Sequence, residues 1–585
     1  MEGKTRISGV ALRFRKMFMP GEIDITIDFS GHATYTVRIQ VIYKRREPIM
    51  TKKRLFALFL TLLLCASAAP VFAEEEVPTI GIAISDAVNV EDFETNTMTL
   101  MLEEACGVDL TFDVYPSTDY NSKINMMISA GGSELPDVIL VGPSDAELIS
   151  WIESGVLLPI TEYCYDETLA PNLHKAMERT GVNILQQITM YDGEIYGIPR
   201  LNQSYTNEYP DKAYYNMEWL EQLGMSAPTN ADELYELLVK VKETDLNGNG
   251  THDEIGMVGT FGNGYEGWFN YCMSPFVYTG GSNYLTVEDG VVGLAYTTEE
   301  WKEGLKFIRK LFEEGLIPQE ILTQDGNQYL AMLNSTEPTT MMFFYMSASR
   351  VNAANEWRNV YEAVPPLNGP EGKPISKYAP STADNGNFFI TRNCENPEAA
   401  FRVGDMLVSE YYSIMTRWGE EGVDWDYVEN VEGADEWVAW VDGFDLLITV
   451  YDDATFWSSG EIQNRSWMQK GPYIREYGIA NGRAKDPATV SIFDTHTSEG
   501  DNLYQIEVYR PDEYIPKLIY SADEIDVVAD IQTTLNDFVR EWTANFMAGN
   551  MDIDENWDAF QEELKNIGVD EYLEIVQTVY DRMYK

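Results

Sequence analysis

The sequence predicts an α/β protein in which helices flank a parallel sheet. Residues 79–85 form a short apolar run, and apolar side chains then alternate along residues 108–114, which is typical of a strand with one buried face. Residues 124–128 place isoleucine and methionine on one helical face, and residues 137–141 are apolar enough for a buried strand. The succession of strand, helix and strand indicates a βαβ unit, whose strands lie parallel.

Capping signals predict helices further along the chain. Residues 229–232 read Thr-Asn-Ala-Asp after a proline, and leucines at helical spacing follow, so a helix should run up to the loop that begins at Asp245. Thr298 caps a second helix that ends at Gly315, and Pro397 takes the first position of a third. Residues 531–584 are predicted to be mostly helical.

Composition and charge narrow the class of protein. The chain has 585 residues, of which 44% are hydrophobic, so it is long enough for several domains with sizeable cores. Its formal net charge of −54 would repel both nucleic acids and anionic membrane surfaces, so neither is expected as a partner.

The amino-terminal part is basic and predicts export. Residues 52–54 are charged, residues 55–65 are rich in leucine, and residues 71–73 read Val-Phe-Ala, so residues 50–73 form a signal peptide cleaved near Glu74. Residues 1–49 then become an upstream extension that the exported protein lacks. An uncleaved membrane anchor is the alternative, whereas lipidation at Cys65 is disfavoured because Leu64 precedes it.

Cysteines and histidines give no metal or catalytic pattern. Beyond the predicted signal peptide, Cys106, Cys164, Cys272 and Cys394 are widely separated. The sequence therefore allows two alternatives: these residues form two disulfides, or they are free buried thiols. The chain has only 4 histidines, none near another, which argues against a zinc site or a histidine-based triad.

A glycine-punctuated loop has the spacing of a calcium site. An EF-hand-type loop supplies oxygen ligands at positions 1, 3, 5, 7 and 9 and needs glycine at position 6. Counted from the start of the loop, these ligands are Asp245, Asn247, Asn249, the carbonyl of Thr251 and Asp253, with Gly250 at the turn. Position 12 is Gly256, so a closing carboxylate would have to be Glu254. The alternative is a polar surface turn.

Several stretches together resemble the extracellular solute-binding proteins of ABC importers, type 1, which include maltose- and alginate-binding proteins and an LplA-like group. The stretches are residues 119–132, 135–139, 192–199, 215–224, 245–254, 417–425, 556–560 and 572–580. The resemblance implies a two-lobed fold of the periplasmic-binding-protein type II, or Venus flytrap, class, in which a discontinuous chain crosses between lobes. It also implies that the loop from Asp245 to Glu254 binds Ca²⁺ structurally.

The implied segments follow the family pattern. The first lobe takes residues 74–205 and 338–395, and the second takes residues 206–337 and 396–585, the last with the carboxyl-terminal helices.

Sugar recognition implies candidate ligand-binding residues. Sugar rings pack their C–H faces on aromatic rings, and their hydroxyls need planar polar partners. The candidates are Trp268, Asn270, Tyr271, Phe344, Tyr345 and Trp418, with Arg200, Asn202, Asp384 and Asn387 as polar partners. The alternatives are that the aromatic residues are core residues and that the polar residues serve turns.

The resemblance implies a binding protein rather than an enzyme. We expect a monomeric receptor, secreted or held at the cell surface or in the periplasm, that captures an oligosaccharide and delivers it to a membrane permease. A secreted glycoside hydrolase, which needs two carboxylates at the scissile bond, is the alternative from another class. A binding protein for a peptide or another solute is a third possibility.

Overall fold

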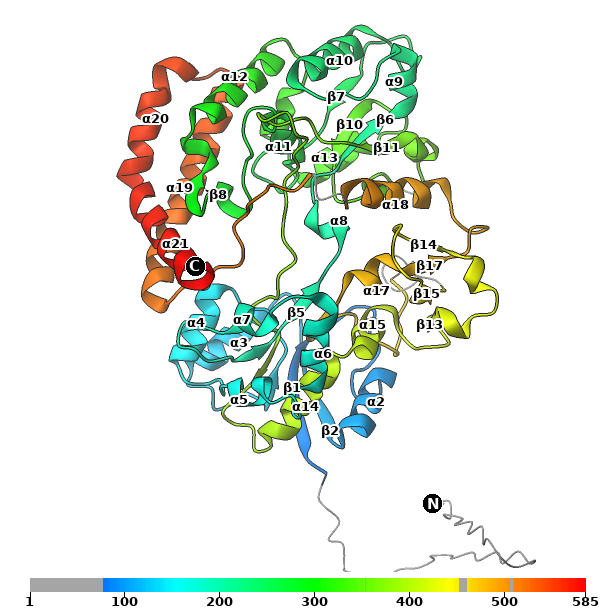
Figure 1. The fold of residues 1–585 in the computed structure, drawn as a ribbon, viewed down its shortest axis with the longest axis vertical. Helices are drawn as coiled ribbons and strands as arrows, with labels where there is room; N and C mark the ends of the chain where they lie inside the picture. The colour runs from blue at the N-terminus through cyan, green and yellow to red at the C-terminus, as the bar shows by residue number, and fades with distance from the viewer. Residues whose placement is uncertain (1–76, 353, 452–459, 506–508) are drawn as a thin grey trace, which may run out of the picture. The chain divides into compact units, whose positions relative to one another are not determined.

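The computed structural model describes residues 77–585 except 353, 452–459 and 506–508. Residues 77–585 form one compact unit (Figure 1). The predicted extension 1–49, the predicted signal peptide 50–73 and Cys65 all lie outside the described residues. Among the helices that are described, none is both long and apolar enough to cross a bilayer.

The first sheet has five strands in the order β2-β1-β3-β12-β4. Their bounds are β1 Thr79–Ser85, β2 Asp109–Tyr115, β3 Val138–Ile139, β4 Gly197–Ile198 and β12 Phe388–Ile390. β1 pairs in parallel with β2 and β3, as the βαβ pattern predicts. β12 pairs antiparallel with both β3 and β4, so the sheet is mixed and one of its strands comes from far along the chain.

Helices cover both faces of this sheet because β1 alternates its side chains between two cores. Ile80, Ile82 and Ile84 pack with helices α2, α6, α14 and α15, whereas Ala83 lies in the core that holds α3 and α4. The helices of this lobe are α2 Thr97–Cys106, α3 Tyr120–Ser129, α4 Asp145–Glu153, α5 Thr161–Tyr165, α6 Pro171–Thr180, α7 Ile184–Ile188, α14 Pro397–Leu407 and α15 Glu410–Trp418.

The second sheet has four strands in the order β11-β6-β10-β7. Their bounds are β6 Ala213–Asn216, β7 Ile255–Met257, β10 Thr340–Phe344 and β11 Tyr361–Val364, and a hairpin of β8 Leu285–Glu288 and β9 Val291–Leu294 accompanies them. Around this sheet lie α9 Met217–Leu223, α10 Ala231–Glu243, α11 Gly267–Met273, α12 Glu299–Glu313, α13 Gly326–Leu333 and α18 Ile492–Tyr504. The expected cap at Thr298 and the helix that runs up to the Asp245 loop are both present.

Three long helices complete the second lobe. They are α19 Ala522–Ala548, α20 Ile553–Ile567 and α21 Val569–Tyr584, so the predicted helical region begins nine residues earlier than expected. α19 packs on α12, and the apolar residues of α19 and α20 share the large core of the second sheet (Figure 1). α19 also contacts α4 of the first lobe.

A small third sheet, which the sequence did not predict, has the order β13-β15-β17-β14. Its strands are β13 Trp425–Tyr427, β14 Val438–Ala439, β15 Ile448–Val450 and β17 Arg483–Lys485. Beside it, β16 Tyr473–Arg475 pairs in parallel with β5 Arg200–Asn202. Along the chain, the short helix α8 Tyr205–Glu208 follows β5, and the short helix α17 Tyr477–Asn481 follows β16.

The chain passes between the lobes along connecting segments. Residues 203–212 lead from β5 through α8 to β6, residues 365–387 return from β11 to β12, and α18 packs again on β11 (Figure 1). Two predicted boundaries therefore differ from the strand pairings. Residues 340–364 belong to the second sheet rather than to the first lobe, and α14 and α15 pack on the first sheet rather than the second. Apolar periodicity identifies a buried strand but does not say which sheet it joins.

The crossing segment is tied down by a buried ion pair. The fully buried Lys212 ammonium lies 3.2 Å from Asp501 of α18 and donates to the carbonyl oxygens of Tyr205 and Met346, each at 3.0 Å. Asp501 also accepts from the Thr206 hydroxyl, and from the Trp440 indole at 3.2 Å. This network joins the crossing segment to α18 and to the third sheet.

Candidate functional site

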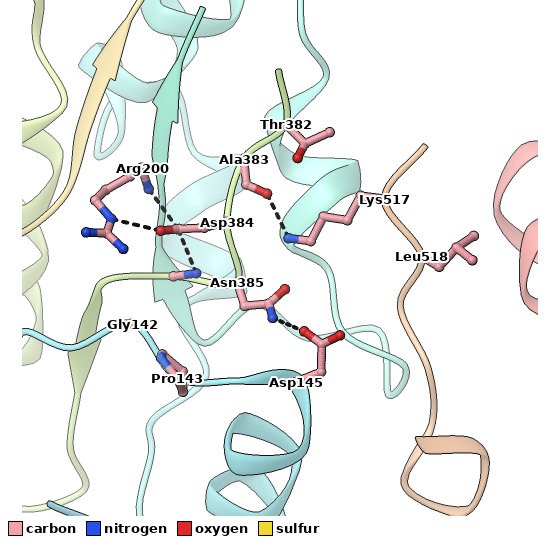
Figure 2. Close-up of a pocket in the computed structure, with 11 residues that line it drawn as sticks. Gly142, Pro143, Asp145, Arg200, Thr382, Ala383, Asp384, Asn385, Lys517 and Leu518 are labelled. Atoms are coloured by element: carbon pink, nitrogen blue, oxygen red, sulfur yellow. Dashed lines mark hydrogen bonds and ion pairs between the residues drawn. The ribbon is translucent and has the colours of Figure 1, made fainter. Parts of the chain in front are cut away.

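A polar pocket lies where the carboxyl ends of the parallel strands of the first sheet meet the connecting segments (Figure 2). Its volume is about 270 Å³, and four parts of the chain line it: the turn after β3, the start of β5, the segment before β12 and the segment before α19. The lining residues are Gly142, Pro143, Asp145, Arg200, Thr382, Ala383, Asp384, Asn385, Gly386, Lys517 and Leu518. In α/β proteins this edge of the sheet is where ligands bind.

Arg200 and Asp384, both predicted, form the central pair of the pocket. The Arg200 Nε donates to Asp384 Oδ2 at 2.9 Å, and the Arg200 backbone N–H donates to Asp384 Oδ1 at 2.9 Å. The Asp384 backbone N–H in turn donates to the Arg200 carbonyl at 3.0 Å. These bonds clip β5 to the returning connection, and they leave the guanidinium Nη groups directed away from Asp384 (Figure 2).

Lys517, Asp145 and Asn385 add charged and polar groups that the sequence did not reveal. The Lys517 ammonium donates to the carbonyl of Ala383 at 2.9 Å, and Asn385 Nδ2 donates to Asp145 Oδ1 (Figure 2). Burial lowers the pKa of Lys517 to about 8, against the opposing effect of the carboxylates of Asp384 and Asp145. Asp145 closely follows a buried strand, which is the one sequence signal that could have indicated it.

Asn387, another predicted residue, is buried beside the pocket. Its backbone N–H donates to Ile198 at 2.8 Å, but its side-chain Oδ1 is buried without a hydrogen-bond partner. A Cβ on Gly142 would lie 3.0 Å from Arg200 Nη2 and 3.6 Å from Asn387 Nδ2, so the small residue lets both groups reach the turn. The predicted Asn202 lies at the end of β5, where its carbonyl accepts from Ser381 at 3.3 Å.

A third cation, Lys470, lies at the end of β1. The Lys470 ammonium donates to the Ser85 hydroxyl at 2.7 Å, and burial lowers its pKa while the charge of Asp86 opposes the shift. Neither Lys470 nor Ser85 was predicted, although Ser85 ends the first predicted strand.

On the second lobe, the predicted Tyr345 belongs to an aromatic and cationic cluster. The Arg350 guanidinium lies 4.6 Å from the Tyr345 ring and 4.8 Å from the Tyr265 ring, and Tyr265 stacks on Tyr329 at 4.8 Å. Tyr345 is partly exposed, and its backbone N–H donates to the carbonyl oxygen of Lys212, on the crossing segment, at 3.0 Å. This cluster therefore lies at the end of β10, beside the connection between the lobes.

Trp268, one of the predicted ligand residues, occupies a core position. Its side chain is 0% exposed, and its indole N–H donates to the carbonyl of Thr260 at 2.8 Å. Phe269 and Phe312 pack against it with ring centroids 5.9 and 6.0 Å away. The indole has no face open to a ligand in this structure, so Trp268 is a core residue, which was the alternative interpretation of the sequence.

The remaining predicted residues are also buried. Asn270 donates to Asp211 at 2.7 Å and accepts from Thr279 at 3.0 Å. The Tyr271 hydroxyl shares a hydrogen bond of 2.9 Å with Tyr215, and its ring packs on Phe344. Trp418 is 4% exposed and lies beneath Arg475, with 5.6 Å between the guanidinium and its ring. In this structure these side chains do not line the pocket.

The loop from Asp245 to Glu254 is folded around its own carboxylates. The Asp245 carboxylate accepts from the N–H groups of Gly248 at 2.8 Å and Gly250 at 2.9 Å. Glu254 Oε1 accepts from the backbone of Leu246 and Asn247, whereas its Oε2 is buried without a partner. A buried carboxylate oxygen without a donor fits a hard cation, which takes oxygen ligands.

Other features of this loop depend on its amide side chains. Nδ2 of Asn247 donates to Asp253 at 3.1 Å, and Nδ2 of Asn249 does so at 3.1 to 3.2 Å. In the part of the chain that the structure covers, no three or more His, Cys, Asp and Glu side chains gather into a metal centre. The predicted calcium set would therefore need amide and carbonyl oxygens as well as carboxylates.

Cys106, Cys164, Cys272 and Cys394 are free and buried. Of the two alternatives from the sequence, the structure has buried thiols rather than disulfides among these residues.

Two α/β lobes, joined by connecting segments and with a polar pocket at their junction, define a two-lobed receptor for a small solute. Residues 89–412 match the family model described as bacterial extracellular solute-binding protein. The chain belongs to this family.

Relatives of known role and structure agree with this assignment. The fructooligosaccharide ABC transporter substrate-binding protein FusA of Streptococcus pneumoniae is 27% identical over 82% of this chain and 86% of its own length. Its structure in complex with kestose has a TM-score of 0.64 at 25% identity, covering 86% of this chain and 99% of FusA. Another FusA structure is of a variant described as an EF-hand mutant.

Two further comparisons extend the range of relatives. The polygalacturonan/rhamnogalacturonan-binding protein YtcQ of Bacillus subtilis is 23% identical, over 56% of this chain and 63% of its own length. An extracellular solute-binding protein from Bifidobacterium longum subsp. infantis has a TM-score of 0.72 at 22% identity, covering 88% of this chain and 100% of its own, and shows the shared fold.

Proposed function

We propose that this chain is the receptor of an ABC importer and that it captures a carbohydrate in the pocket of Figure 2. The observation that carries the proposal is the pocket itself, where four segments bring together Arg200, Asp384, Asp145, Asn385 and Lys517. Such convergent donors and acceptors suit the hydroxyls of a sugar. FusA, a relative over most of the chain, carries the name of a carbohydrate receptor.

Closure of the lobes would bring the second half of the site to the sugar. Tyr345 directly follows β10 and contacts Lys212 on the crossing segment, and the Arg350 guanidinium lies against the Tyr345 ring. A partly exposed tyrosine ring backed by a guanidinium offers a flat apolar face with a polar edge. The hinge motion that this fold class uses would place that face opposite the pocket.

Calorimetric titration of a panel of oligosaccharides tests the proposal. We expect at least one sugar to bind the wild-type protein, and Asp384→Asn to weaken that binding about tenfold or more by removing an acceptor. The matched control is Asp558→Asn, since Asp558 is exposed on α20 and should leave affinity unchanged. A folded protein that binds no saccharide would contradict the proposal, and release of reducing ends from the sugars would favour the hydrolase alternative.

We further propose that the loop from Asp245 to Glu254 holds a structural Ca²⁺. The buried and unpartnered Oε2 of Glu254 supports this, as do the carboxylates of Asp245 and Asp253 in the same loop. Binding would require the amides of Asn247 and Asn249 to turn their oxygens inward, because their nitrogens now face Asp253. The ion would stabilise the end of α10 without taking part in sugar binding.

Delivery outside the cell is part of the same proposal. The family is extracellular, and residues 50–73 have the pattern of a signal peptide. We propose that the mature protein starts near Glu74, acts as a monomer and passes its ligand to a membrane permease. Amino-terminal sequencing of the exported protein tests the cleavage site, and a lipid-modified Cys65 would contradict it.

A further inference from the structure

The charges in the pocket are already paired within the protein. Its two cations are Arg200 and Lys517, and its two carboxylates are Asp384 and Asp145. Arg200 donates to Asp384 from both its side chain and its backbone at 2.9 Å. Lys517 donates to the carbonyl of Ala383 at 2.9 Å and feels the charges of Asp384 and Asp145. The pocket therefore has no excess of positive charge.

The nearby cation outside the lining does not change this balance. Lys470 donates to Ser85 at 2.7 Å, and the carboxylate of Asp86 acts on it from the same edge of the sheet. The carboxylate of Asp86 therefore offsets the positive charge of Lys470.

This balance bears on the kind of sugar that fits. A sugar carboxylate that enters the pocket loses its hydration, and that loss must be offset by a cation. The cations here already have protein partners, and the carboxylate of Asp145 would repel a second anion at short range. Neutral hydroxyls meet no such barrier: they can accept from the Nη groups of Arg200 and donate to the carboxylate of Asp145, both of which line the pocket.

Resting on the carbohydrate-binding function proposed above, we infer that this pocket selects neutral saccharides and rejects acidic ones built from uronic acids. Family membership leaves this choice open, since the relatives include proteins named for fructooligosaccharides and for polygalacturonan. What favours the neutral class is the internal pairing of Arg200 with Asp384 and the carboxylate of Asp145 in the wall.

The test compares sugars that differ only in the carboxylate. Calorimetry at near-neutral pH would measure galacto-oligosaccharides against oligogalacturonates of equal length, and manno-oligosaccharides against oligomannuronates, with fructooligosaccharides as a further neutral series. We expect every bound sugar to be neutral and to bind at least about a hundredfold more tightly than its acidic counterpart. Affinity should also change little with salt concentration, because no net charge is neutralised.

A charge variant sharpens the result. Asp384→Asn frees the Arg200 guanidinium, so it should lose affinity for the neutral sugar and gain at least about tenfold for the matched acidic one. Asp558→Asn changes the net charge equally at an exposed site and should do neither. Wild-type protein that binds an acidic oligosaccharide as tightly as its neutral counterpart would overturn the inference and leave the proposed function standing. A folded protein that binds neither class removes the proposed function and this inference with it.

Discussion

The buried cation of the pocket should make stability depend on pH in a way that one substitution can isolate. Burial lowers the pKa of Lys517 from 10.5 to about 8, although two carboxylates oppose the shift. Unfolding restores the ordinary value, so between these two pKa values the unfolded chain binds more protons than the folded protein. The free energy of unfolding therefore rises with pH through this range. Below about pH 8 the ammonium is charged in both states, and the cost of burying it is fully present.

The size of this effect follows from the two pKa values. Between about pH 7 and about pH 9.5, the titration of Lys517 should add about 2 kcal/mol to the free energy of unfolding. This is an upper value, because the side chain is only partly buried by surface area and solvent screens part of the effect. Lys517→Met removes the titrating group and keeps a stem of similar length, so all other titrations cancel in the comparison with wild type.

Urea unfolding at the two pH values measures this directly. The stability of Lys517→Met relative to wild type should fall by up to about 2 kcal/mol on going to the higher pH. Lys373→Met is the control for the loss of a lysine, since the Lys373 side chain is 58% exposed and lies outside the pocket. A stability difference for Lys517→Met that is the same at both pH values would refute the burial of a charged lysine in this pocket.

Three further predictions follow from the core and the calcium loop. Chelation should lower the melting temperature of the wild type, by the equivalent of about 2.7 kcal/mol if calcium was at a hundredfold excess over its Kd. Asp245→Ala should abolish this difference. Identical melting with and without chelator would show that the loop is a polar turn and not a calcium site. Trp268→Ala should cost about 3–5 kcal/mol of folding free energy in urea unfolding, with unchanged sugar affinity per folded molecule. Lys212→Met should cost about 3–5 kcal/mol, because it leaves Asp501 buried without its cation, and the double variant with Asp501→Leu should recover part of the loss in the same assay.

Local elements of the fold were predictable because they depend on short-range patterns. The run from Thr79 to Ser85 is β1 residue for residue, and Thr298 caps α12 as expected. Which sheet a buried strand joins was not predictable in the same way. β10 is buried along its whole length because it lies between β6 and β7, and its composition would suit a central strand of either lobe.

The site shows the same division between local and long-range information. Arg200 and Asp384 were predicted and lie together, although 184 positions separate them in the chain. Trp268 was predicted as a stacking face for a sugar ring, but the backbone of its own lobe packs against it: a Cβ on Gly259 would lie 2.3 Å from the indole. Lys517 gives no signal in the sequence, because only the path of the chain before α19 brings it to the pocket.

The position of β12 has a consequence for how the protein is made. This strand fills the place between β3 and β4, yet it follows β4 by roughly 190 residues. At synthesis rates of about 5–20 residues per second, the first sheet would lack an interior strand for on the order of ten to forty seconds. The first sheet can therefore be completed only late in synthesis. The same arrangement makes folding depend on contacts between distant residues, so refolding from denaturant should be slow for a protein of this size.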